Sequence, residues 1–427
     1  MIDLQPVKGT RDFFPDDMRL RNWLFNVWRE TAAMFGFEEY DSCVLESEEL
    51  YIRKAGDEIS DQLYNFEDKG GRKLSLRPEM TPTLARMIIS QQKSLSFPIK
   101  WFSVAQCFRY ERMTKGRRRE HFQWNMDIVG QDHIVAEAEL LSALIKACSS
   151  MGLTTEHIRI FINDRRILNA ILTNLSVADA QHPAILVILD KKDKLRPEDF
   201  RQLLKEASLS EDQISRLEEY LSTSDLHQLG EKLGENEGIL NLKKLLSTME
   251  MSGLAAYFQF DITIVRGLSY YTGTVFEMNT PSKNQRAICG GGRYDSLLST
   301  YGGDVISSVG FGFGDVVILD MLKELNLLPQ LGKKLDYMIV PFSWDEASLA
   351  LKIANALTDR GSKVECNFSM KKMKKTLQQA NDLNVSKVLF LFPEELQKQQ
   401  IVVKDMKTHD QQVLPLLAFL PSYSRGA

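Results

Sequence analysis

The chain has 427 residues, of which 44% are hydrophobic and 26% charged, and its formal net charge is -4. The length predicts about three domains, and the composition excludes a disordered tail and a uniformly basic nucleic-acid-binding protein. The sequence has no run of about 18 apolar residues, so no membrane span is expected, and residues 1–11 lack the pattern of a signal peptide. Five scattered cysteines without a CxxC pair indicate neither a zinc site nor disulfides and favour a reducing, cytoplasmic location.

Apolar periodicity and turn residues predict the elements of the first part of the chain. The expected elements are a helix over 15–35, a strand over 37–44, a short helix over 47–55, a strand over 73–77, a helix over 84–92 with Thr81 as its N-cap, strands over 99–110 and 122–129, and a helix over 136–148. The two strands that flank the basic segment are typical of a β-hairpin with a charged tip.

The character of the sequence changes twice after this part. Residues 165–257 are expected to form a mostly helical insertion, with one strand over 184–189, because Lys and Glu alternate with Leu at helical spacing. Strands over 258–265 and 274–278, two glycine clusters and a helix over 316–325 follow. Beyond the candidate linker 328–332, strands over 337–342, 363–366 and 387–392 alternate with helices over 345–360 and 371–380. This alternation predicts a small parallel α/β domain.

The tip of the hairpin holds six positive charges within eleven residues, namely Arg109, Arg112, Lys115, Arg117, Arg118 and Arg119. A solvated charged turn is the simplest interpretation. However, Arg109 lies in an aromatic strand, where an unpaired arginine is costly to bury. Gln123 and Asp127 are four residues apart in the returning strand and therefore share one face. Because arginine binds phosphate oxygens bidentately, the hairpin also suits a phosphate-bearing nucleotide and a small polar substrate.

Three other segments each allow a structural and a functional interpretation. Glu79 precedes a helix, where its carboxylate could cap the helix or hold a substrate ammonium. Arg266 and the pair Tyr270-Tyr271 form either an aromatic corner or part of a site. The glycines at 290–292 and at 310, 312 and 314 indicate close approach of a ligand or of another backbone. They fit neither the dinucleotide-binding nor the P-loop pattern.

Together, these motifs resemble those of class II aminoacyl-tRNA synthetases. Arg266-Gly-Leu-Ser-Tyr-Tyr271 followed by Gly291-Gly-Arg-Tyr-Asp295 is specific to the histidyl-tRNA synthetase family. The resemblance covers almost the whole chain, from Lys8-Gly-Thr-Arg-Asp-Phe-Phe-Pro15 through Arg77-Pro-Glu79 and Phe108-Arg-Tyr-Glu111 to the C-terminal domain. It implies an α+β fold with an antiparallel sheet flanked by helices, a helical insertion and a C-terminal α/β anticodon-binding domain. The implied parts are core residues 1–164 and 258–327, insertion residues 165–257 and anticodon-binding residues 335–427.

The resemblance also implies an activity and the residues that perform it. The implied enzyme is a homodimeric histidine–tRNA ligase that uses ATP and Mg²⁺ to form histidyl-adenylate and then charges tRNA(His). Arg109 and Arg266 are its implied catalytic residues. The implied histidine-binding residues are Glu79, Thr81, Gln123, Asp127, Tyr270, Tyr271 and Tyr294. The implied ATP-binding residues are Arg109, Glu111, Arg117 and Arg266, and the tRNA-binding residues are Lys115, Arg118 and Arg119. The motifs assign no metal ligands.

The sequence departs from the family pattern at three positions. Cys43 stands where proline is usual in the dimer-interface motif, and Asp127 stands where glutamate is common. Val317 occupies the position of the arginine that binds the ATP γ-phosphate in the family. Arg112 and Arg117 are the nearest candidates by motif to compensate for Val317.

Two other functions remain open at this point. One is a catalytically weak paralogue that acts as a histidine sensor or regulatory subunit for ATP phosphoribosyltransferase, which the loss at Val317 favours. That paralogue typically lacks the C-terminal domain and the arginine–tyrosine motif, both of which this chain has. The other is a histidine-adenylating enzyme without tRNA, which would not need residues 335–427. Residues 333–427 carry a net charge of +4, so the overall charge does not exclude tRNA.

Overall fold

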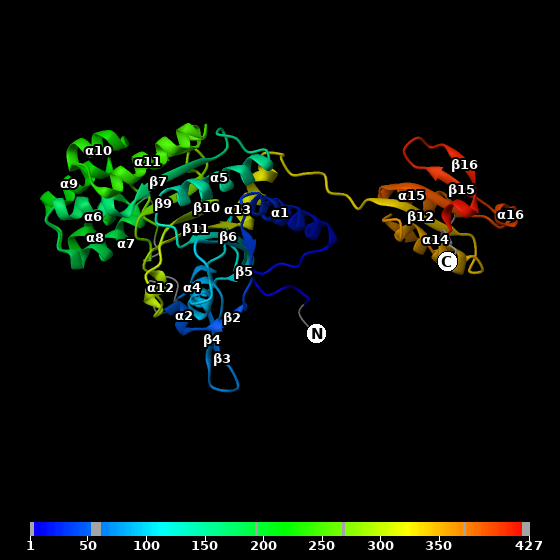
Figure 1. Ribbon diagram of the computed structural model, residues 1–427, viewed down its shortest axis with the longest axis horizontal. Helices are drawn as coiled ribbons and strands as arrows, with labels where there is room; N and C mark the ends of the chain where they lie inside the picture. The colour runs from blue at the N-terminus through cyan, green and yellow to red at the C-terminus, as the bar shows by residue number, and fades with distance from the viewer. Residues whose placement is uncertain (1–3, 53–60, 193–194, 267–269, 370–372, 421–427) are drawn as a thin grey trace. The chain divides into compact units, whose positions relative to one another are not determined.

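The computed structural model describes residues 4–52, 61–192, 195–266, 270–369 and 373–420. These residues form two compact units, which divide after Leu328 (Figure 1). Within the described ranges, no helix combines the length and the apolar character needed to cross a bilayer. The expected division of the chain into four parts stays a prediction.

The first unit is built on an eight-stranded sheet with the order β1-β5-β6-β11-β10-β9-β7-β8. Its strands are β1 (Glu38–Glu39), β5 (Ile99–Phe108), β6 (Glu120–Val129), β7 (Arg159–Asp164), β8 (Phe258–Phe260), β9 (Thr274–Asn279), β10 (Cys289–Arg293) and β11 (Ser308–Gly314). The outer pairs β1–β5 and β7–β8 are parallel, whereas all other neighbours are antiparallel. The expected α+β class, with a mainly antiparallel sheet flanked by helices, is confirmed.

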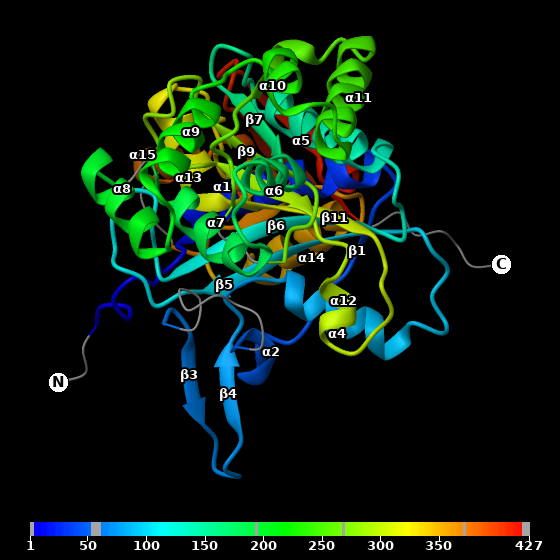
Figure 2. The same ribbon diagram turned by 90° about the vertical axis from the view of Figure 1, so that its left-hand side faces the viewer.

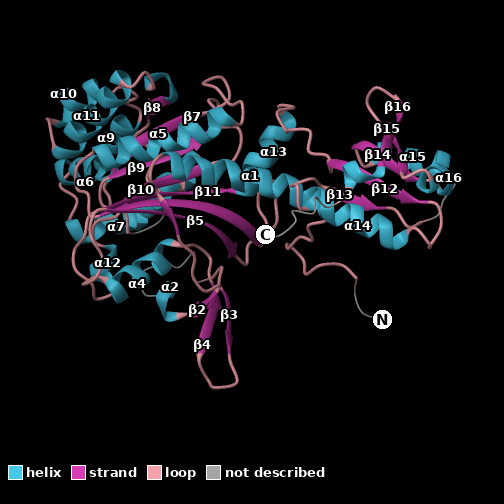
Figure 3. Ribbon diagram, turned by 45° about the vertical axis from the view of Figure 1, so that its right-hand side comes forward, coloured by secondary structure: helices cyan, strands magenta, loops and turns pink. Residues whose placement is uncertain are grey.

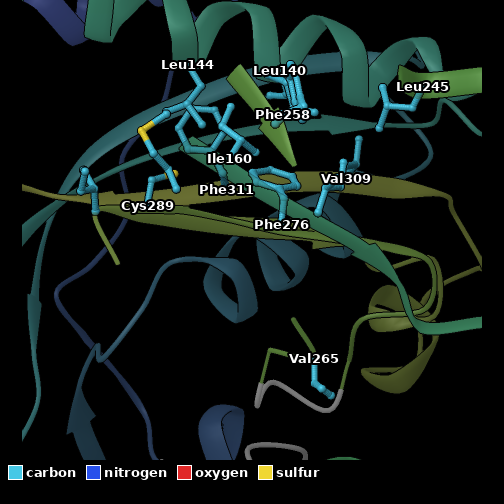
Figure 4. Packing of buried hydrophobic residues seen from close by; sticks show 14 of the residues in the cluster. Leu140, Leu144, Ile160, Leu245, Phe258, Val265, Phe276, Cys289, Val309 and Phe311 are labelled. Carbon is cyan, nitrogen blue, oxygen red and sulfur yellow. The ribbon is translucent and has the colours of Figure 1, made fainter. Parts of the chain in front are cut away.

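One face of this sheet is covered by α1 (Pro15–Met34), α5 (Val135–Ser150) and α13 (Asp315–Glu324), which Figure 3 shows in cyan along the sheet. Aromatic side chains fill the contact: the rings of Trp28 and Trp124 stack with centroids 5.9 Å apart. Figure 4 shows Phe276 and Phe311 on the sheet, below Leu140 and Leu144 of α5. We call this the core face, since it buries the largest hydrophobic cluster of the unit.

The opposite face carries α4 (Thr81–Gln91) and the short helices α2 (Glu49–Ile52) and α12 (Leu297–Thr300). A second, smaller cluster packs α4 and α12 against one end of the sheet. A separate three-stranded sheet with the order β2-β4-β3 projects from this side (Figure 2). Its strands are β2 (Leu45–Ser47), β3 (Tyr64–Glu67) and β4 (Lys73–Leu76). The helices leave part of this face open, and we call it the site face.

Helices gather beside β7 and β9 at one end of the unit (Figure 1). They are α6 (Arg165–Asn174), α7 (His182–Asp190), α8 (Pro197–Glu206), α9 (Glu211–Leu221), α10 (Leu226–Leu233) and α11 (Glu237–Met251), with 3₁₀ turns at Asp179–Gln181 and Ala255–Tyr257. Side chains cap several of them; the hydroxyl of Ser210, for example, accepts from the N–H of Gln213. In α11, Leu242, Leu245 and Met249 recur on one buried stripe.

The second unit has a five-stranded sheet with the order β13-β12-β14-β15-β16. Its elements are β12 (Leu335–Pro341), α14 (Ala347–Thr358), β13 (Val364–Cys366), α15 (Met373–Asp382), β14 (Val385–Leu391), α16 (Pro393–Gln397), β15 (Gln400–Asp405), β16 (Gln411–Pro415) and a 3₁₀ turn at Leu416–Phe419. Strand β12 is parallel to β13 and β14, but β15 and β16 are antiparallel to their neighbours. The expectation of a parallel α/β domain is met by β12, β13 and β14, whereas the antiparallel β15 and β16 were missed, because the sequence analysis identified no strand beyond residue 392.

Several local predictions were also wrong, and each has a physical cause. Residues 184–189 belong to α7, because a short apolar run flanked by Pro183 fits a helix whose buried positions recur at helical spacing. The strand expected over 258–265 ends at Phe260, where the carboxylate of Asp261 accepts from Thr263 and closes a turn. The strand expected over 37–44 is reduced to β1, because the chain leaves the large sheet after Tyr40.

Strands β3 and β7 were not predicted at all. Helix α4 begins at Thr81 itself, so Thr81 is not the N-cap. The short helix expected over 47–55 and the helix expected over 371–380 extend into residues 53–60 and 370–372, which lie outside the described residues. Positions 267–269 of the histidine-family motif also lie outside them.

Candidate active site

Strand alternation separates polar from apolar side chains within β6. Trp124 and Met126 point to the core face, whereas Gln123 and Asp127 lie on the site face together with Asn125. The register pairs Asp127 with Gly310 of β11, and Gly310 in turn pairs with Gly292 of β10. The predicted polar residues therefore lie beside the glycine-rich strands.

These glycines make room for the side chains of the site. A Cβ at Gly312 would overlap the amide of Gln123, and a Cβ at Gly310 would overlap the carboxylate of Asp127. A Cβ at Gly290 would overlap the guanidinium of Arg266. The sequence allowed a ligand or another backbone at these positions; instead, predicted site residues lie flat against the sheet there.

A cavity of about 240 Å³ opens above this part of the sheet. Six of the predicted residues line it, namely Arg109, Glu111, Arg117, Arg118, Gln123 and Arg266. Glu111 alone is acidic among the described residues of the lining, and its Oε2 lies 2.8 Å from Nε of Arg117. The remaining arginines give the cavity an excess of positive charge, which suits an anionic ligand such as a polyphosphate.

Arg109 and Arg266 enter the cavity from different elements. Nε of Arg109, which follows β5, donates to the backbone oxygen of Pro78 at 2.9 Å. Nη1 of Arg266 lies 3.3 Å from Oε2 of Glu277 on β9. The backbone of Arg266 has a φ of 57°, in the left-handed region that a residue with a Cβ seldom adopts. Such strain is common at functional sites, and here it accompanies an arginine placed at the centre of the candidate site.

A hydrogen-bonded group of acids and tyrosines lies next to the cavity. The hydroxyl of Tyr270 donates to Oε2 of Glu79 at 3.1 Å, and the hydroxyl of Tyr294 donates to Oδ1 of Asp127. The rings of Tyr270 and Tyr294 meet edge to face with centroids 5.8 Å apart. The side chain of Thr81 favours a lower pKa for Tyr270, against the larger effect of burial, which raises it. This group can bind a small polar ligand through several directed hydrogen bonds.

Burial changes the protonation of this group. Burial raises the pKa of Glu79, although Arg109 and the hydroxyl of Tyr270 oppose the change. Burial also raises the pKa of Asp127 to about 7, opposed by the hydrogen bond from Tyr294. Burial, together with the charge of Arg109, lowers the pKa of His121 to about 3, so the imidazole stays neutral beside the arginines. Oδ2 of Asp127 is buried without a hydrogen-bond partner and is free to accept a proton donor from a ligand.

A second cavity of about 620 Å³ also has Arg266 in its lining. Tyr271 and Thr272 line it together with residues of α6 and α7, among them Arg165 and His182. Arg266 is thus shared between the two cavities, and the helices of the insertion form a wall of the second one.

Two of the three predicted tRNA-binding residues, Lys115 and Arg119, do not line the first cavity. Nζ of Lys115 lies 2.7 Å from Oε1 of Glu324 on α13. The guanidinium of Arg119 lies 3.9 Å from the ring centre of Tyr110. The predicted contacts of Lys115, Arg118 and Arg119 with tRNA stay predictions.

The sequence analysis missed residues that hold the site together. Nη2 of Arg11 lies 2.9 Å from Oδ2 of buried Asp315, whose Oδ1 accepts from the N–H of Phe122. This contact ties the N-terminal segment and α13 to the hairpin. Arg293 of the glycine-rich motif forms a bidentate ion pair with buried Glu137 at 2.6 Å. No motif reveals such pairings, because their partners are far apart in the sequence.

The lining of the first cavity also includes Arg286, which the sequence analysis did not single out. It follows β9 and lies four residues before the triple glycine of β10. The sequence could have indicated Arg286, because it is a basic residue just before the glycines at 290–292, where close approach of a ligand or of another backbone was expected.

Comparison with known proteins gives consistent matches over nearly the full chain. Residues 9–314 match the family described as histidyl-tRNA synthetase, and residues 336–421 match the family described as anticodon binding domain. A chloroplastic and mitochondrial histidine–tRNA ligase of Arabidopsis thaliana is 44% identical over 96% of this chain and 85% of its own length. A histidine–tRNA ligase of Opitutus terrae is 37% identical over 97% of each chain. The crystal structure of histidyl-tRNA synthetase from Nostoc sp. PCC 7120 has the same fold, with a TM-score of 0.80 at 22% identity over 97% of this chain and 98% of that chain.

Proposed function

The chain belongs to the histidyl-tRNA synthetase family, a family of class II aminoacyl-tRNA synthetases, and from this premise we infer that it is a histidine–tRNA ligase. It activates L-histidine with ATP and transfers the histidyl group to the 3′ end of tRNA(His). The observation that supports these steps best is the arginine-rich cavity that adjoins the buried group of Glu79, Asp127 and tyrosines. A phosphate-binding region and a polar amino-acid pocket thus share one face of the sheet.

In the activation step, a carboxylate oxygen of histidine forms a bond to the α-phosphorus of ATP. The bond from that phosphorus to the oxygen bridging to the β-phosphate breaks, and pyrophosphate leaves with the electron pair. The carboxylate is already ionised, so the step needs no general base. Arg109 and Arg266 line the cavity from different elements and neutralise charge on the in-line transition state. Preorganised charge of this kind is usually the largest catalytic contribution.

Histidine selection falls to the buried hydrogen-bonding group. We assign Glu79, Thr81 and Gln123 to the ammonium or adjacent groups, with Tyr270 bound to Glu79. We assign Asp127, Tyr271 and Tyr294 to the surroundings of the imidazole. Buried Asp127 has an unpartnered oxygen that accepts an imidazole N–H. An amino acid without that donor leaves the carboxyl unpaired, and a site built this way discriminates by a factor of about ten thousand or more.

In ATP binding, we assign Glu111 to the recognition of the adenine amino group and Arg117 to the binding of the distal phosphates. The family uses ATP together with Mg²⁺. In the described part of the chain, no group of three His, Cys, Asp or Glu side chains is arranged to hold a metal ion. We expect the ion to arrive bound to the phosphates of ATP.

The transfer step needs access for the 3′ end of the tRNA. The terminal ribose hydroxyl attacks the carbonyl carbon of histidyl-adenylate, and AMP leaves. We propose that the second unit, which matches an anticodon-binding family, binds the anticodon loop of the tRNA. We propose that Lys115, Arg118 and Arg119 at the hairpin tip bind the acceptor end. The second cavity adjoins Arg266 and offers a path for the terminal ribose.

We place the enzyme in the cytoplasm as a homodimer. Its five cysteines are unpaired thiols, as suits a reducing compartment; recovery of the protein from an organelle fraction would contradict this location. Val44, Leu45 and Phe66 expose 36, 43 and 49% of their surface at the projecting three-stranded sheet, where Val44 and Leu45 belong to one outer strand or its start and Phe66 to the other. Exposed apolar residues on both outer strands of so small a sheet suit an interface with a second copy. Light scattering is expected to give the mass of a dimer and, for Leu45→Asp, that of a monomer.

The decisive experiment combines two assays on the purified full chain. Histidine-dependent exchange of pyrophosphate into ATP is expected, as is charging of a tRNA(His) transcript but not of a transcript for another amino acid. A histidine sensor would bind histidine without exchange, and an adenylating enzyme without tRNA would perform exchange without charging. Either outcome would overturn the ligase function. Exchange is expected to be lost in Arg266→Ala.

A further inference from the structure

Three segments meet at one end of the arginine-rich cavity. Gly116 lies in the hairpin turn, Arg286 in the loop between β9 and β10, and Val317 in the first turn of α13. A Cβ built on Gly116 would lie 3.3 Å from Cδ of Arg286 and 3.3 Å from Cγ2 of Val317. Arg286 and Val317 are therefore neighbours on either side of this glycine, although 31 positions separate them in the sequence.

Arg286 has no partner for its charge in the part of the chain that the structure describes. No hydrogen bond or ion pair holds its guanidinium, and its side chain is exposed at the cavity mouth. Partial burial and the charges of Arg117 and Arg109 lower the pKa of Arg286, and the carboxylates of Glu111 and Glu277 oppose this change without pairing with the guanidinium. A guanidinium that lines the cavity, is exposed and has no hydrogen-bonded or ion-paired partner among the described residues is available to bind an anion.

Arg112 and Arg117, the two arginines that the motifs suggest as compensation for Val317, are less suitable than Arg286 for binding the terminal phosphates. Nε of Arg117 already lies 2.8 Å from the carboxylate of Glu111. Arg112 does not line the cavity. Val317 itself presents only methyl groups to this end of the cavity, so α13 supplies no charge from that position. Arg286 is thus the unengaged cation adjacent to it.

We propose that Arg286 binds the terminal phosphates of ATP at the position next to Val317 and holds the departing pyrophosphate. The proposal rests on the proposed function, since it assigns a substrate contact to the histidine-activation reaction. A valine at position 317 and an arginine at position 286 then form a matched pair: the short side chain of α13 leaves space that the arginine of the β9–β10 loop fills. The long side chain of Arg286 reaches, from the loop between β9 and β10, the phosphates that an arginine at position 317 would bind from α13.

The first test compares Arg286→Gln with Arg112→Gln in the full-length enzyme. Arg286→Gln is expected to raise the KM for ATP in pyrophosphate exchange about tenfold to a hundredfold, the usual effect of losing a hydrogen bond to a charged group. The KM for histidine is expected to change less than twofold. Arg112→Gln keeps the same charge change outside the cavity and is expected to leave both constants unchanged. An equal effect of the two variants would indicate a general loss of positive charge and overturn the proposal.

Binding measurements separate the phosphate contact from catalysis. Calorimetry with inorganic tripolyphosphate is expected to show at least tenfold weaker binding to Arg286→Gln than to the wild-type chain, while binding of AMP stays unchanged. Equal binding of tripolyphosphate to both proteins would overturn the proposal even if exchange activity differed. If the wild-type chain lacks exchange activity, the proposed function fails, but the tripolyphosphate measurement still tests Arg286.

Transfer of the arginine between the two positions provides the strictest test. The double variant Arg286→Gln, Val317→Arg restores a guanidinium beside Gly116 from the opposite side. It is expected to recover most of the ATP affinity lost in Arg286→Gln. A folded double variant with no recovery would contradict the shared position, whereas recovery would not follow from a merely structural role of Arg286.

Discussion

The two faces of the eight-stranded sheet are made from the same strands but differ in composition. On the core face, Trp124 and Phe313 pack against the helices without solvent exposure. On the site face, one residue away along the same strands, Gln123 and Asp127 lie over glycines. Strand geometry sends successive side chains to opposite faces, so a two-residue repeat separates the residues that stabilise the fold from those that bind the substrates.

This separation has an energetic consequence. The core face removes large apolar surfaces from water, which favours folding. The site face buries carboxyl groups such as Glu79 and Asp127, whose pKa values rise because burial disfavours their charge, and it holds Arg266 at a positive φ. These features cost stability and persist because the opposite face supplies it. Substitutions on the two faces should therefore have separable effects.

The largest effect on stability is expected on the core face. Trp124→Ala removes a fully buried indole that stacks on Trp28 and should lower the free energy of unfolding of the first unit by about 3–5 kcal/mol. Urea denaturation followed by circular dichroism measures this. As a control, Met251→Ala truncates an exposed side chain and should change stability by less than about 0.5 kcal/mol. A loss below 1 kcal/mol in Trp124→Ala would contradict the role assigned to the core face.

The largest effect on activity is expected on the site face. Arg109→Ala removes a cation that lines the cavity and should reduce the rate of pyrophosphate exchange about a hundredfold to a thousandfold, with little change in thermal stability. Arg196→Ala provides the control, since Arg196 pairs with Asp199 at the surface of the insertion, and full activity is expected. If Arg109→Ala unfolds the protein instead, the two faces are not separable at this position.

The buried carboxyl of Asp127 should make stability depend on pH. Its pKa is raised from 3.8 to about 7 by burial, so between these values the folded state holds a proton that the unfolded chain has released. Stability should therefore fall as pH rises through this window, by at most about 1.4 kcal/mol per pH unit for one group. Asp127→Asn should flatten that slope in urea titrations from pH 5 to 7. As a control, Asp405→Asn removes a carboxylate whose pKa is lowered by backbone hydrogen bonds, and it should leave the slope of stability against pH unchanged. If Asp127→Asn also leaves this slope unchanged, Asp127 is not the group that causes it.

The smallest changes in structure provide the finest comparison. A Cβ at Gly312 would meet only the side chain of Gln123 among its nearest atoms, whereas a Cβ at Gly291 would meet backbone and the ring of Phe276. Gly312→Ala should raise the KM for histidine by about tenfold with little loss of stability, because Gln123 must move. Gly291→Ala should instead lower the free energy of unfolding by about 1–3 kcal/mol through overpacking. Equal effects of the two variants on the KM for histidine would contradict the separation, because a substitution on the core face would then disturb substrate binding on the site face.

Much of this molecule could be predicted from local patterns. The hairpin strands β5 and β6 and helices such as α5 and α13 were expected within a few residues, since their apolar periodicity is strong. Motif spacing identified Arg109, Gln123 and Arg266, and all three line one cavity. Weak or short patterns failed: β3 and β7 were missed, and α7 was taken for a strand, because a short apolar run does not distinguish the two.

By itself, the sequence determined the family, the α+β class and the identity of most charged side chains in the arginine-rich cavity, because these are recorded in motifs and in the alternation of residues along strands. Only the tertiary structure decided what the glycines accommodate, which arginines are already paired, and that Arg286 lies beside Val317. Those facts depend on contacts between segments far apart in the chain. Local periodicity cannot encode them, since the packing of the whole sheet fixes which neighbour fills each space.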